Sequence, residues 1–138
     1  MIRILIADDF APMRRVMRRL IKREVDIEVV GEALRLPEAL LLIHQLQPDV
    51  IVMDDRLPPT NCAGATRHLR DSGMETPILV VATYPDAGLV QGSLKRGVNG
   101  FIFKEEFIEH FIRAIRAVYE GVLYLSPMAE ELLRSDSE

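Results

Sequence analysis

A chain of 138 residues with 49% hydrophobic and 28% charged residues has the length and balance of one folded globular domain, which excludes a disordered chain. No apolar run reaches the roughly 18 residues of a transmembrane helix, the first apolar run turns acidic at Asp8 where a signal peptide would continue, and the single Cys62 excludes an internal disulfide framework. A net charge of -4 gives no general attraction to nucleic acid. We therefore expect a cytoplasmic protein without a membrane partner.

Short apolar runs alternate along the chain with stretches of helical spacing. The pattern predicts, in order, a strand at 2–7, a helix at 13–21 with Pro12 near its start, a strand at 27–33, a helix from Pro37 that stops before Pro48, a strand at 50–53 and a weak helix at 60–71. It continues with a strand at 77–82, a short helix between an Asp86 cap and Gly97, a strand at 100–103, and a long helix at 107–119 that Gly121 ends.

The predicted strands are almost continuously apolar, which is typical of strands that a parallel sheet buries on both faces. We therefore predict an α/β fold, a single-domain (βα)5 doubly wound parallel sheet with helices on both sides. The domain is expected to span residues 1–121. Residues 122–138 are expected to form a C-terminal extension, in which Ser126 can cap a short helix and Pro127 suits its first turn.

Polar side chains follow four of the predicted strands directly. They are Asp8 and Asp9 after the first strand, Asp54 and Asp55 after the third, Thr83 after the fourth and Lys104 after the fifth. In an open parallel sheet, functional groups gather at the carboxyl ends of the strands, so we expect these side chains to lie together. Carboxylates packed closely raise each other's pKa unless a cation shares the site, and Mg²⁺ favours carboxylate oxygens. The pattern indicates a small site for Mg²⁺ and a phosphoryl group.

The same residues carry a resemblance to a known family. The chain resembles a response-regulator receiver domain, the phosphoacceptor module of two-component signalling, through the ordered motifs DD, DDRLP, AT and FIFK after the first, third, fourth and fifth strands. The resemblance covers roughly residues 2–121 and implies a flavodoxin-like sheet of strand order 2-1-3-4-5. The extension resembles the start of the linker in regulators with a LuxR-type helix-turn-helix output domain.

The resemblance implies which residues hold the phosphoryl group and the metal. Asp54, four residues before Pro58, stands at the phosphoacceptor position. Asp9, Asp54 and the main-chain carbonyl of Arg56 would bind Mg²⁺ directly, and Asp8 would act mainly through water. Asp55 would point away from Asp54, because neighbouring residues on a strand face opposite sides.

The resemblance also implies which residues respond to phosphorylation. Thr83 would hydrogen-bond the phosphoryl group, and Lys104 would pair with one of its oxygens. Phe101 stands at the switch-aromatic position, three residues before Lys104. Because Tyr84 follows Thr83, and Arg56 lies two residues past the acceptor, we expect both side chains at the mouth of the pocket, where their bulk would slow hydrolysis of the phosphorylated form.

As a receiver, the chain would take its phosphoryl group from a sensor histidine kinase. It would be a signalling phosphoacceptor that catalyses its own phosphorylation and dephosphorylation, not an enzyme with a separate substrate. Phosphorylation would switch the surface formed by the fourth helix, fifth strand and fifth helix, through which a homodimer could form. The output is expected to be transcription, with DNA bound only through an output domain that this sequence lacks.

Other interpretations stay open from the residues alone. A degenerate receiver that acts only as a protein-interaction module would keep the fold and these motifs. A dehalogenase-type phosphatase needs alternating acids after its first strand, and a flavodoxin-like flavin module needs a phosphate loop rich in Ser, Thr and Gly. Neither pattern matches the residues after Ala7. The basic face of the first helix indicates either a solvated surface or a docking face for an acidic kinase; its residues are Arg14, Arg15, Arg18, Arg19, Lys22 and Arg23.

Overall fold

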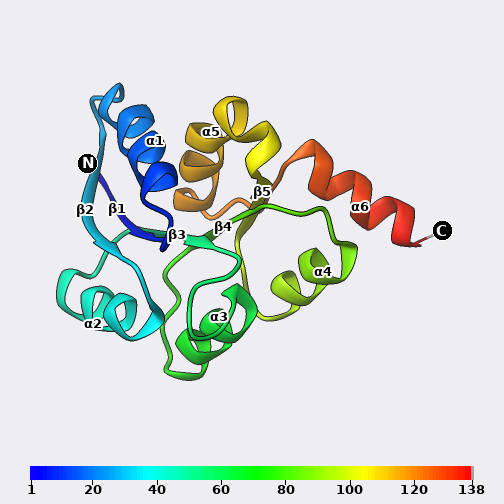
Figure 1. Ribbon diagram of the computed structural model, residues 1–138, viewed down its shortest axis with the longest axis horizontal. Helices are drawn as coiled ribbons and strands as arrows, with labels where there is room; N and C mark the ends of the chain where they lie inside the picture. Colours follow the sequence, from blue (N-terminus) through cyan, green and yellow to red (C-terminus); the bar gives the residue numbers. More distant parts are fainter. Residues whose placement is uncertain (138) are drawn as a thin grey trace.

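The computed structural model describes residues 1–137 as a central sheet with helices on both faces (Figure 1). Its strands are β1 (Ile2–Ala7), β2 (Ile27–Ala33), β3 (Val50–Asp54), β4 (Ile78–Ala82), β5 (Gly100–Phe103) and β6 (Tyr124–Leu125). Its helices are α1 (Ala11–Lys22), α2 (Leu36–Leu46), α3 (Cys62–Asp71), α4 (Ala87–Lys95), α5 (Phe107–Tyr119) and α6 (Pro127–Ser137), with a 3₁₀ turn, η1 (Lys104–Glu106), before α5. Helices α1 and α5 cover one face of the sheet, and α2, α3 and α4 cover the other (Figure 1).

All strand pairs of the sheet are parallel, and their order is β2-β1-β3-β4-β5-β6. The predicted doubly wound arrangement and the order of its first five strands are therefore confirmed. Because the strands run in one direction, β1, β3, β4 and β5 all end at the same edge of the sheet. This edge carries every residue that the sequence analysis placed at a strand end.

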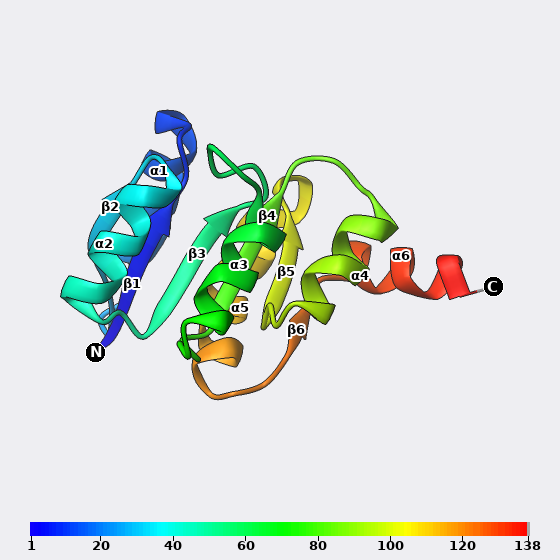
Figure 2. The same cartoon turned by 90° about the horizontal axis from the view of Figure 1, so that it is seen from below.

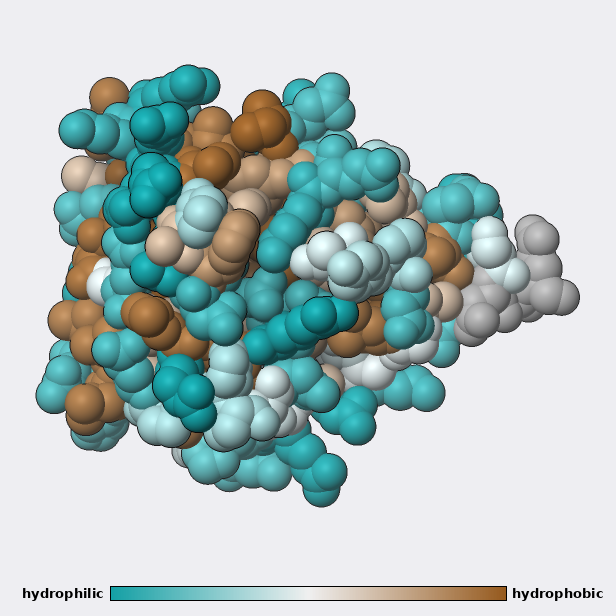
Figure 3. Space-filling view, in the orientation of Figure 1, coloured by the Kyte–Doolittle hydropathy of each residue, from teal (hydrophilic) through white to brown (hydrophobic). Residues whose placement is uncertain are grey.

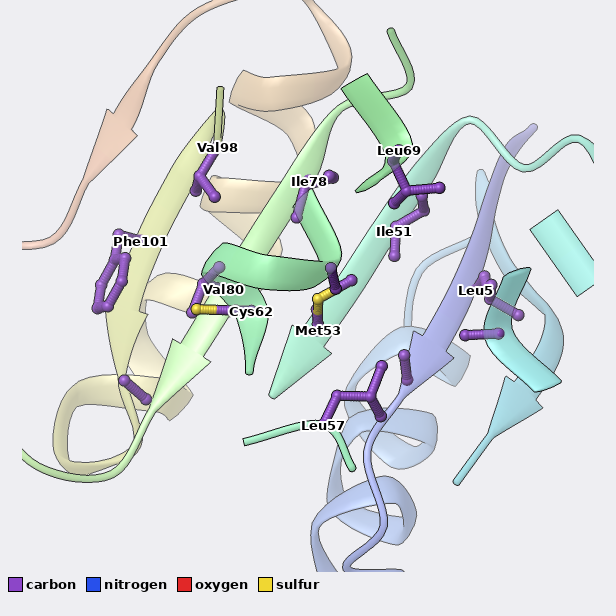
Figure 4. Packing of buried hydrophobic residues seen from close by; sticks show 14 of the residues in the cluster. Leu5, Ile51, Met53, Leu57, Cys62, Leu69, Ile78, Val80, Val98 and Phe101 are labelled. Atoms are coloured by element: carbon purple, nitrogen blue, oxygen red, sulfur yellow. The ribbon is translucent and has the colours of Figure 1, made fainter. Parts of the chain in front are cut away.

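The sheet separates two hydrophobic cores. Leu5, Met53 and Phe101 belong to the core between the sheet and α2, α3 and α4, part of which is drawn in Figure 4. Ile4 and Val52, the neighbours of two of these residues in the chain, belong to the core beneath α1 and α5. Successive residues of a strand thus face opposite cores. Since both cores are apolar, the central strands β3, β4 and β5 have no polar alternation, which explains their continuous apolar runs in the sequence.

Short polar residues and glycines set the ends of the helices on this scaffold. The Asp86 carboxylate accepts hydrogen bonds from the amides of Gly88 and Leu89, which confirms the predicted cap of α4. Gly97 follows the end of α4 with φ of 103°, a left-handed conformation that favours glycine. Helix α3 begins two residues later than predicted because Asn61, not an earlier residue, caps it through the Gly64 amide.

The prediction of five strands was incomplete, because the C-terminal extension adds a sixth. Strand β6 pairs with β5, with Leu125 opposite Phe101. The Ser126 hydroxyl then accepts a 3.3 Å hydrogen bond from the Ala129 amide at the start of α6. Ala129 is fully buried, and α6 packs against α4 and β5 (Figure 2). The extension therefore packs on the domain and shares its core.

Hydrophilic residues surround separate apolar patches on the face drawn in Figure 3. Large apolar side chains are exposed on several elements, for example Leu41 on α2, Ile108 on α5 and Val122 before β6. Within residues 1–137, the helices are all too short or too polar to cross a membrane.

Candidate functional site

Three aspartates come together at the carboxyl edge of the sheet, between β1 and β3. One carboxylate oxygen from each of Asp8, Asp9 and Asp54 lies within 4.8 Å of the others. Asp8 and Asp54 are buried, whereas Asp9 is exposed. The structure thus brings together the three carboxylates that the sequence analysis placed at the metal site.

Asp8 is fully buried, and one of its two carboxylate oxygens has no hydrogen bond. Oδ1 accepts a 2.8 Å hydrogen bond from the Phe10 amide, while Oδ2 has no hydrogen-bond partner among residues 1–137. Burial raises the pKa of Asp8 to about 6; the Phe10 amide opposes this shift, and the negative charge of Asp54 adds to it. A cation beside this carboxylate would favour its charged form.

Asp54 ends β3 and faces a cation from the end of β5. Lys104 Nζ lies 3.3 Å from Asp54 Oδ1. This contact is an ion pair without hydrogen-bond geometry, so Oδ1 has no hydrogen-bond partner in the described part of the chain. The Arg56 amide donates a 3.1 Å hydrogen bond to Oδ2. Asp54 is therefore oriented by its own turn, while Oδ1 is still able to accept a ligand.

The donor set fits a small divalent cation. Asp8 Oδ2 and Asp54 Oδ1 are buried oxygens without a hydrogen-bond partner among the described residues, and the exposed Asp9 carboxylate lies beside them. Mg²⁺ prefers such oxygens and keeps several waters, so it needs few protein ligands. The main-chain carbonyl of Arg56, named above as a further ligand, belongs to the turn that directly follows Asp54.

Thr83 and Phe101 belong to neighbouring parts of the sheet, one just after β4 and the other within β5, and their environments differ. Thr83 directly follows β4 and is exposed at the same edge as Asp54. Phe101 lies within β5 and is fully buried, with its ring 5.3 Å from that of Phe103. In this conformation the Phe101 side chain is therefore part of the core, and Leu125 of β6 pairs beside it.

Arg56 and Tyr84 meet at the edge of the sheet. The Arg56 guanidinium carbon lies 5.1 Å from the centroid of the Tyr84 ring, within the range of a cation–π contact. Arg56 follows β3 and Tyr84 follows β4, so the contact joins the loop after Asp54 to the loop that carries Thr83. The Tyr84 side chain is still 61% exposed. The structure brings together the two residues expected at the mouth of the pocket.

Asp55 is a third buried carboxylate at this edge, after Asp8 and Asp54, and sequence reasoning gave it no role. The residue is 7% exposed, and its Oδ1 has no hydrogen-bond partner among residues 1–137. Burial raises the pKa of Asp55, and the charge of Asp54 raises it further. Its main-chain carbonyl accepts the Cys62 amide at the start of α3. Its burial was not predicted, because an acid after a strand usually marks an exposed turn.

Glu106 connects the segment after β5 with α6, a contact that sequence reasoning missed. Its Oε2 accepts the Phe103 amide at 3.2 Å, and its Oε1 accepts the Met128 amide at 3.3 Å. Lys104 begins the same 3₁₀ turn. The turn that carries the lysine is therefore hydrogen-bonded to the first turn of α6. No motif marks this contact, because it depends on where the extension docks.

The basic face of α1 is partly used within the chain. Arg14 and Arg18 both pair with the Glu32 carboxylate of β2, at 3.1 Å and 2.5 Å. Arg15 and Arg19 are exposed. The first pair thus fixes α1 against β2, and the second pair belongs to the solvent-facing surface.

The chain matches one family model and many curated proteins. The model described as the response regulator receiver domain matches residues 4–116. The transcriptional regulatory protein DesR of Bacillus subtilis (strain 168) is 32% identical over 137 residues, which are 99% of this chain and 68% of DesR. The oxygen regulatory protein NreC of Staphylococcus carnosus (strain TM300) is 36% identical over 91% of this chain and 58% of NreC. The chain spans 53% to 58% of the length of the first three curated relatives that it matches.

Solved structures share the fold over nearly the whole chain. A two-component response regulator of the LuxR family from Aurantimonas sp. SI85-9A1 superposes with a TM-score of 0.91 at 31% identity, over 99% of this chain and 98% of that one. The signal receiver domain of NarL from Mycobacterium tuberculosis superposes with a TM-score of 0.82 at 27% identity, over 87% of this chain and 97% of that one. The first of these likenesses includes the β6–α6 extension.

Proposed function

The chain belongs to the family of response regulator receiver domains, and on that premise we propose that Asp54 is the phosphoacceptor of a two-component system. The observation that carries the proposal is the cluster of Asp8, Asp9 and Asp54 beside the Lys104 ammonium. Within this cluster, Asp54 ends a central strand and contacts Lys104 at 3.3 Å. These two features favour Asp54 as the nucleophile whose carboxylate oxygen attacks phosphorus.

In the proposed transfer, a carboxylate oxygen of Asp54 attacks phosphorus in line with the leaving group. The P–N bond of a kinase phosphohistidine breaks, and the imidazole keeps the electron pair. The product is an acyl phosphate on Asp54, which water later hydrolyses to the carboxylate and inorganic phosphate. Phosphoryl transfer depends mainly on positioning and charge stabilisation, and the Lys104 ammonium supplies one positive charge for the phosphoryl oxygens.

The proposed cofactor is Mg²⁺, held by Asp9, Asp54 and the main-chain carbonyl of Arg56, with Asp8 acting through water. When bound, the ion would neutralise negative charge on the phosphoryl oxygens as the new bond forms. The buried oxygens of Asp8 and Asp54 that have no hydrogen bond within the described chain support this assignment. So does the raised pKa of Asp8, because burial makes its carboxylate costly without a cation.

The proposed response to phosphorylation begins with Thr83 and Phe101. The exposed Thr83 hydroxyl would turn toward the phosphoryl group, and Phe101 would move into the space that it leaves. The domain would thereby shift between two arrangements of α4, β5 and α5. Strand β6 and α6 already contact β5 and α4, so self-association through this surface requires that the extension moves or takes part.

The proposed partner is a sensor histidine kinase, and the proposed output is transcription. The support for the output is that curated relatives are named transcriptional regulatory proteins. DNA contact would come from a separate output domain. On this proposal the chain is a phosphoacceptor that catalyses its own phosphorylation and dephosphorylation, and it acts in the cytoplasm.

The phosphoacceptor assignment is tested by intact mass. The chain is incubated with Mg²⁺ and acetyl phosphate or phosphoramidate, and we expect the gain of one phosphoryl group. Asp54→Asn should abolish the gain, because the amide is a poor nucleophile. Asp55→Asn is the matched control and should still be phosphorylated.

Two results would change the conclusion. If Asp54→Asn still gains a phosphoryl group and Asp55→Asn does not, the acceptor is Asp55 and not Asp54. No uptake by the natural sequence from either donor, with Mg²⁺ present, would support a degenerate receiver that acts only through protein contacts.

A further inference from the structure

Helices α3 and α4 lie side by side (Figure 1, Figure 2). Residues of both helices line a groove. The groove has a volume of about 380 Å³. Its walls include Ala63, Gly64 and Arg67 of α3, and Gly88, Gly92 and the Arg96 that follows α4. A second hollow of about 400 Å³ lies toward the C-terminal ends of both helices and shares the lining residues Arg67 and Arg96 with the groove; we call the groove and this hollow together the channel.

The channel is strongly basic at this end. Residues Arg67, Arg70, Lys95 and Arg96 line the second hollow, and Asp71 is the one carboxylate among its lining residues. The whole chain has a net charge of -4. Positive charge is therefore concentrated here against the overall balance, which favours an anionic group in this channel.

Three of these cations are available to a ligand. Arg96 and Lys95 are exposed, and Arg96 donates a 3.0 Å hydrogen bond to the neutral Gly92 carbonyl. Arg67 pairs with Asp71 at 3.8 Å, and both side chains are more than 70% exposed. Such exposed ion pairs contribute little to stability, so a ligand can replace Asp71 at little cost. By contrast, Arg70 is held by the carbonyl oxygens of Gly97, Met74 and Thr76, so it adds charge without being free to move.

Helix α4 has glycine at two positions that line the groove. Gly88 and Gly92 lie inside a helix, where glycine is less favourable than alanine. A Cβ atom added at Gly92 would meet the flexible Arg96 Nη1 at 3.3 Å, and one added at Gly88 would meet Asp86 Oδ1 at the same distance. At Gly92 the neighbour is the flexible end of the exposed Arg96 side chain, whereas at Gly88 it is the Asp86 carboxylate that caps α4, so of the two only Gly92 is not required by internal packing. If the exposed Arg96 side chain turns toward a ligand, the missing side chain at Gly92 lets another backbone approach α4 closely.

We infer that the α3–α4 groove is a docking site for an acidic peptide segment of a partner protein. Carboxylates of the segment pair with Arg67, Lys95 and Arg96, and its backbone lies against Gly92. Leu89 also lines the groove and offers an apolar contact. A nucleic acid fits less well, because a long polyanion would also meet the net negative charge of the rest of the chain.

The test uses the full chain and a fluorescently labelled peptide built of Glu and Ala with one Leu. Binding is followed by fluorescence anisotropy, and the binding site is mapped by NMR amide shifts. We expect shifts at Gly88 and Gly92, and at least tenfold weaker binding by Arg96→Glu. Arg15→Glu on the opposite face of the sheet makes the same change in net charge and should leave affinity within twofold.

A glycine variant separates binding from folding. Gly92→Ala should raise the melting temperature slightly, because alanine favours a helix, and should weaken peptide binding at least threefold by filling the wall. The same peptide with Lys in place of Glu should not bind. Equal loss by Arg15→Glu and Arg96→Glu, amide shifts confined to other elements, or tighter binding of duplex DNA than of the acidic peptide would each overturn the inference.

Discussion

Replacing Tyr84 with alanine is expected to speed the loss of the phosphoryl group from the proposed Asp54 acyl phosphate. Hydrolysis requires a water in line behind phosphorus, and the Arg56–Tyr84 contact joins the two loops beside that position. If the contact must open to admit the water, its strength adds to the barrier. Removing the ring then removes that contribution.

The expected size of this effect follows from the exposure of the contact. Tyr84 is 61% exposed, and its ring centroid lies 5.1 Å from the Arg56 guanidinium carbon. Exposed cation–π contacts contribute about 0.5–1 kcal/mol. Since about 1.4 kcal/mol changes a rate tenfold, the dephosphorylation rate should rise roughly two- to fivefold.

The assay phosphorylates each variant with acetyl phosphate, removes the donor by desalting and follows the decay of the phosphorylated mass. Tyr84→Phe keeps the ring and should decay at the natural rate. Arg56→Gln removes the cation and should accelerate decay about as much as Tyr84→Ala, with little further gain when both are combined. Equal decay of Tyr84→Ala and the natural sequence would refute a gating role for this pair.

Three further outcomes are expected. Asp9→Ala should abolish Mg²⁺ binding in a calorimetric titration, because it removes a direct ligand; unchanged affinity would contradict the proposed metal site. The hydrogen bond from Arg116 lowers the pKa of Asp26, so this carboxylate stabilises the fold above its unfolded pKa of about 3.9 and loses that effect as pH falls through its lower folded value. The difference in unfolding free energy between the natural sequence and Arg116→Gln should therefore shrink below about pH 4, and a difference that grows in acid would disprove this reasoning. Burial raises the pKa of Cys62 to about 11, so iodoacetamide at pH 8 should modify it only on unfolding; rapid modification of the folded chain would show that the thiol is accessible.

Most of the sheet was predictable from sequence because its central strands are buried on both faces and are therefore almost continuously apolar. The runs at residues 2–7, 27–33 and 100–103 match β1, β2 and β5 to the residue. Strand β6 escaped prediction for a physical reason. A strand of two residues is too short to show the alternating pattern of a strand in the sequence. Tyr124 and Leu125 form a strand only because β5 offers an unpaired edge.

The site was predictable to the extent that it depends on strand ends. One rule about parallel sheets was enough to bring Asp8, Asp9 and Asp54 together and to place Lys104 opposite them. Contacts that depend on tertiary placement were not predictable. The burial of Asp55 depends on how the turn after β3 packs, and the bond from Glu106 to the Met128 amide depends on where α6 docks.

The docked extension has a consequence for where this protein can be divided. A chain cut after Gly121 would lose Leu125, Ser126 and Ala129 together, and with them the cover over β5 and α4. The Phe101 carbonyl would lose the Ser126 amide that it now accepts, and β5 would become a bare strand edge of the kind that pairs with other chains. Recombinant receivers of this type are therefore best ended beyond α6, because a shorter piece exposes an aggregation-prone edge next to the residue proposed to switch.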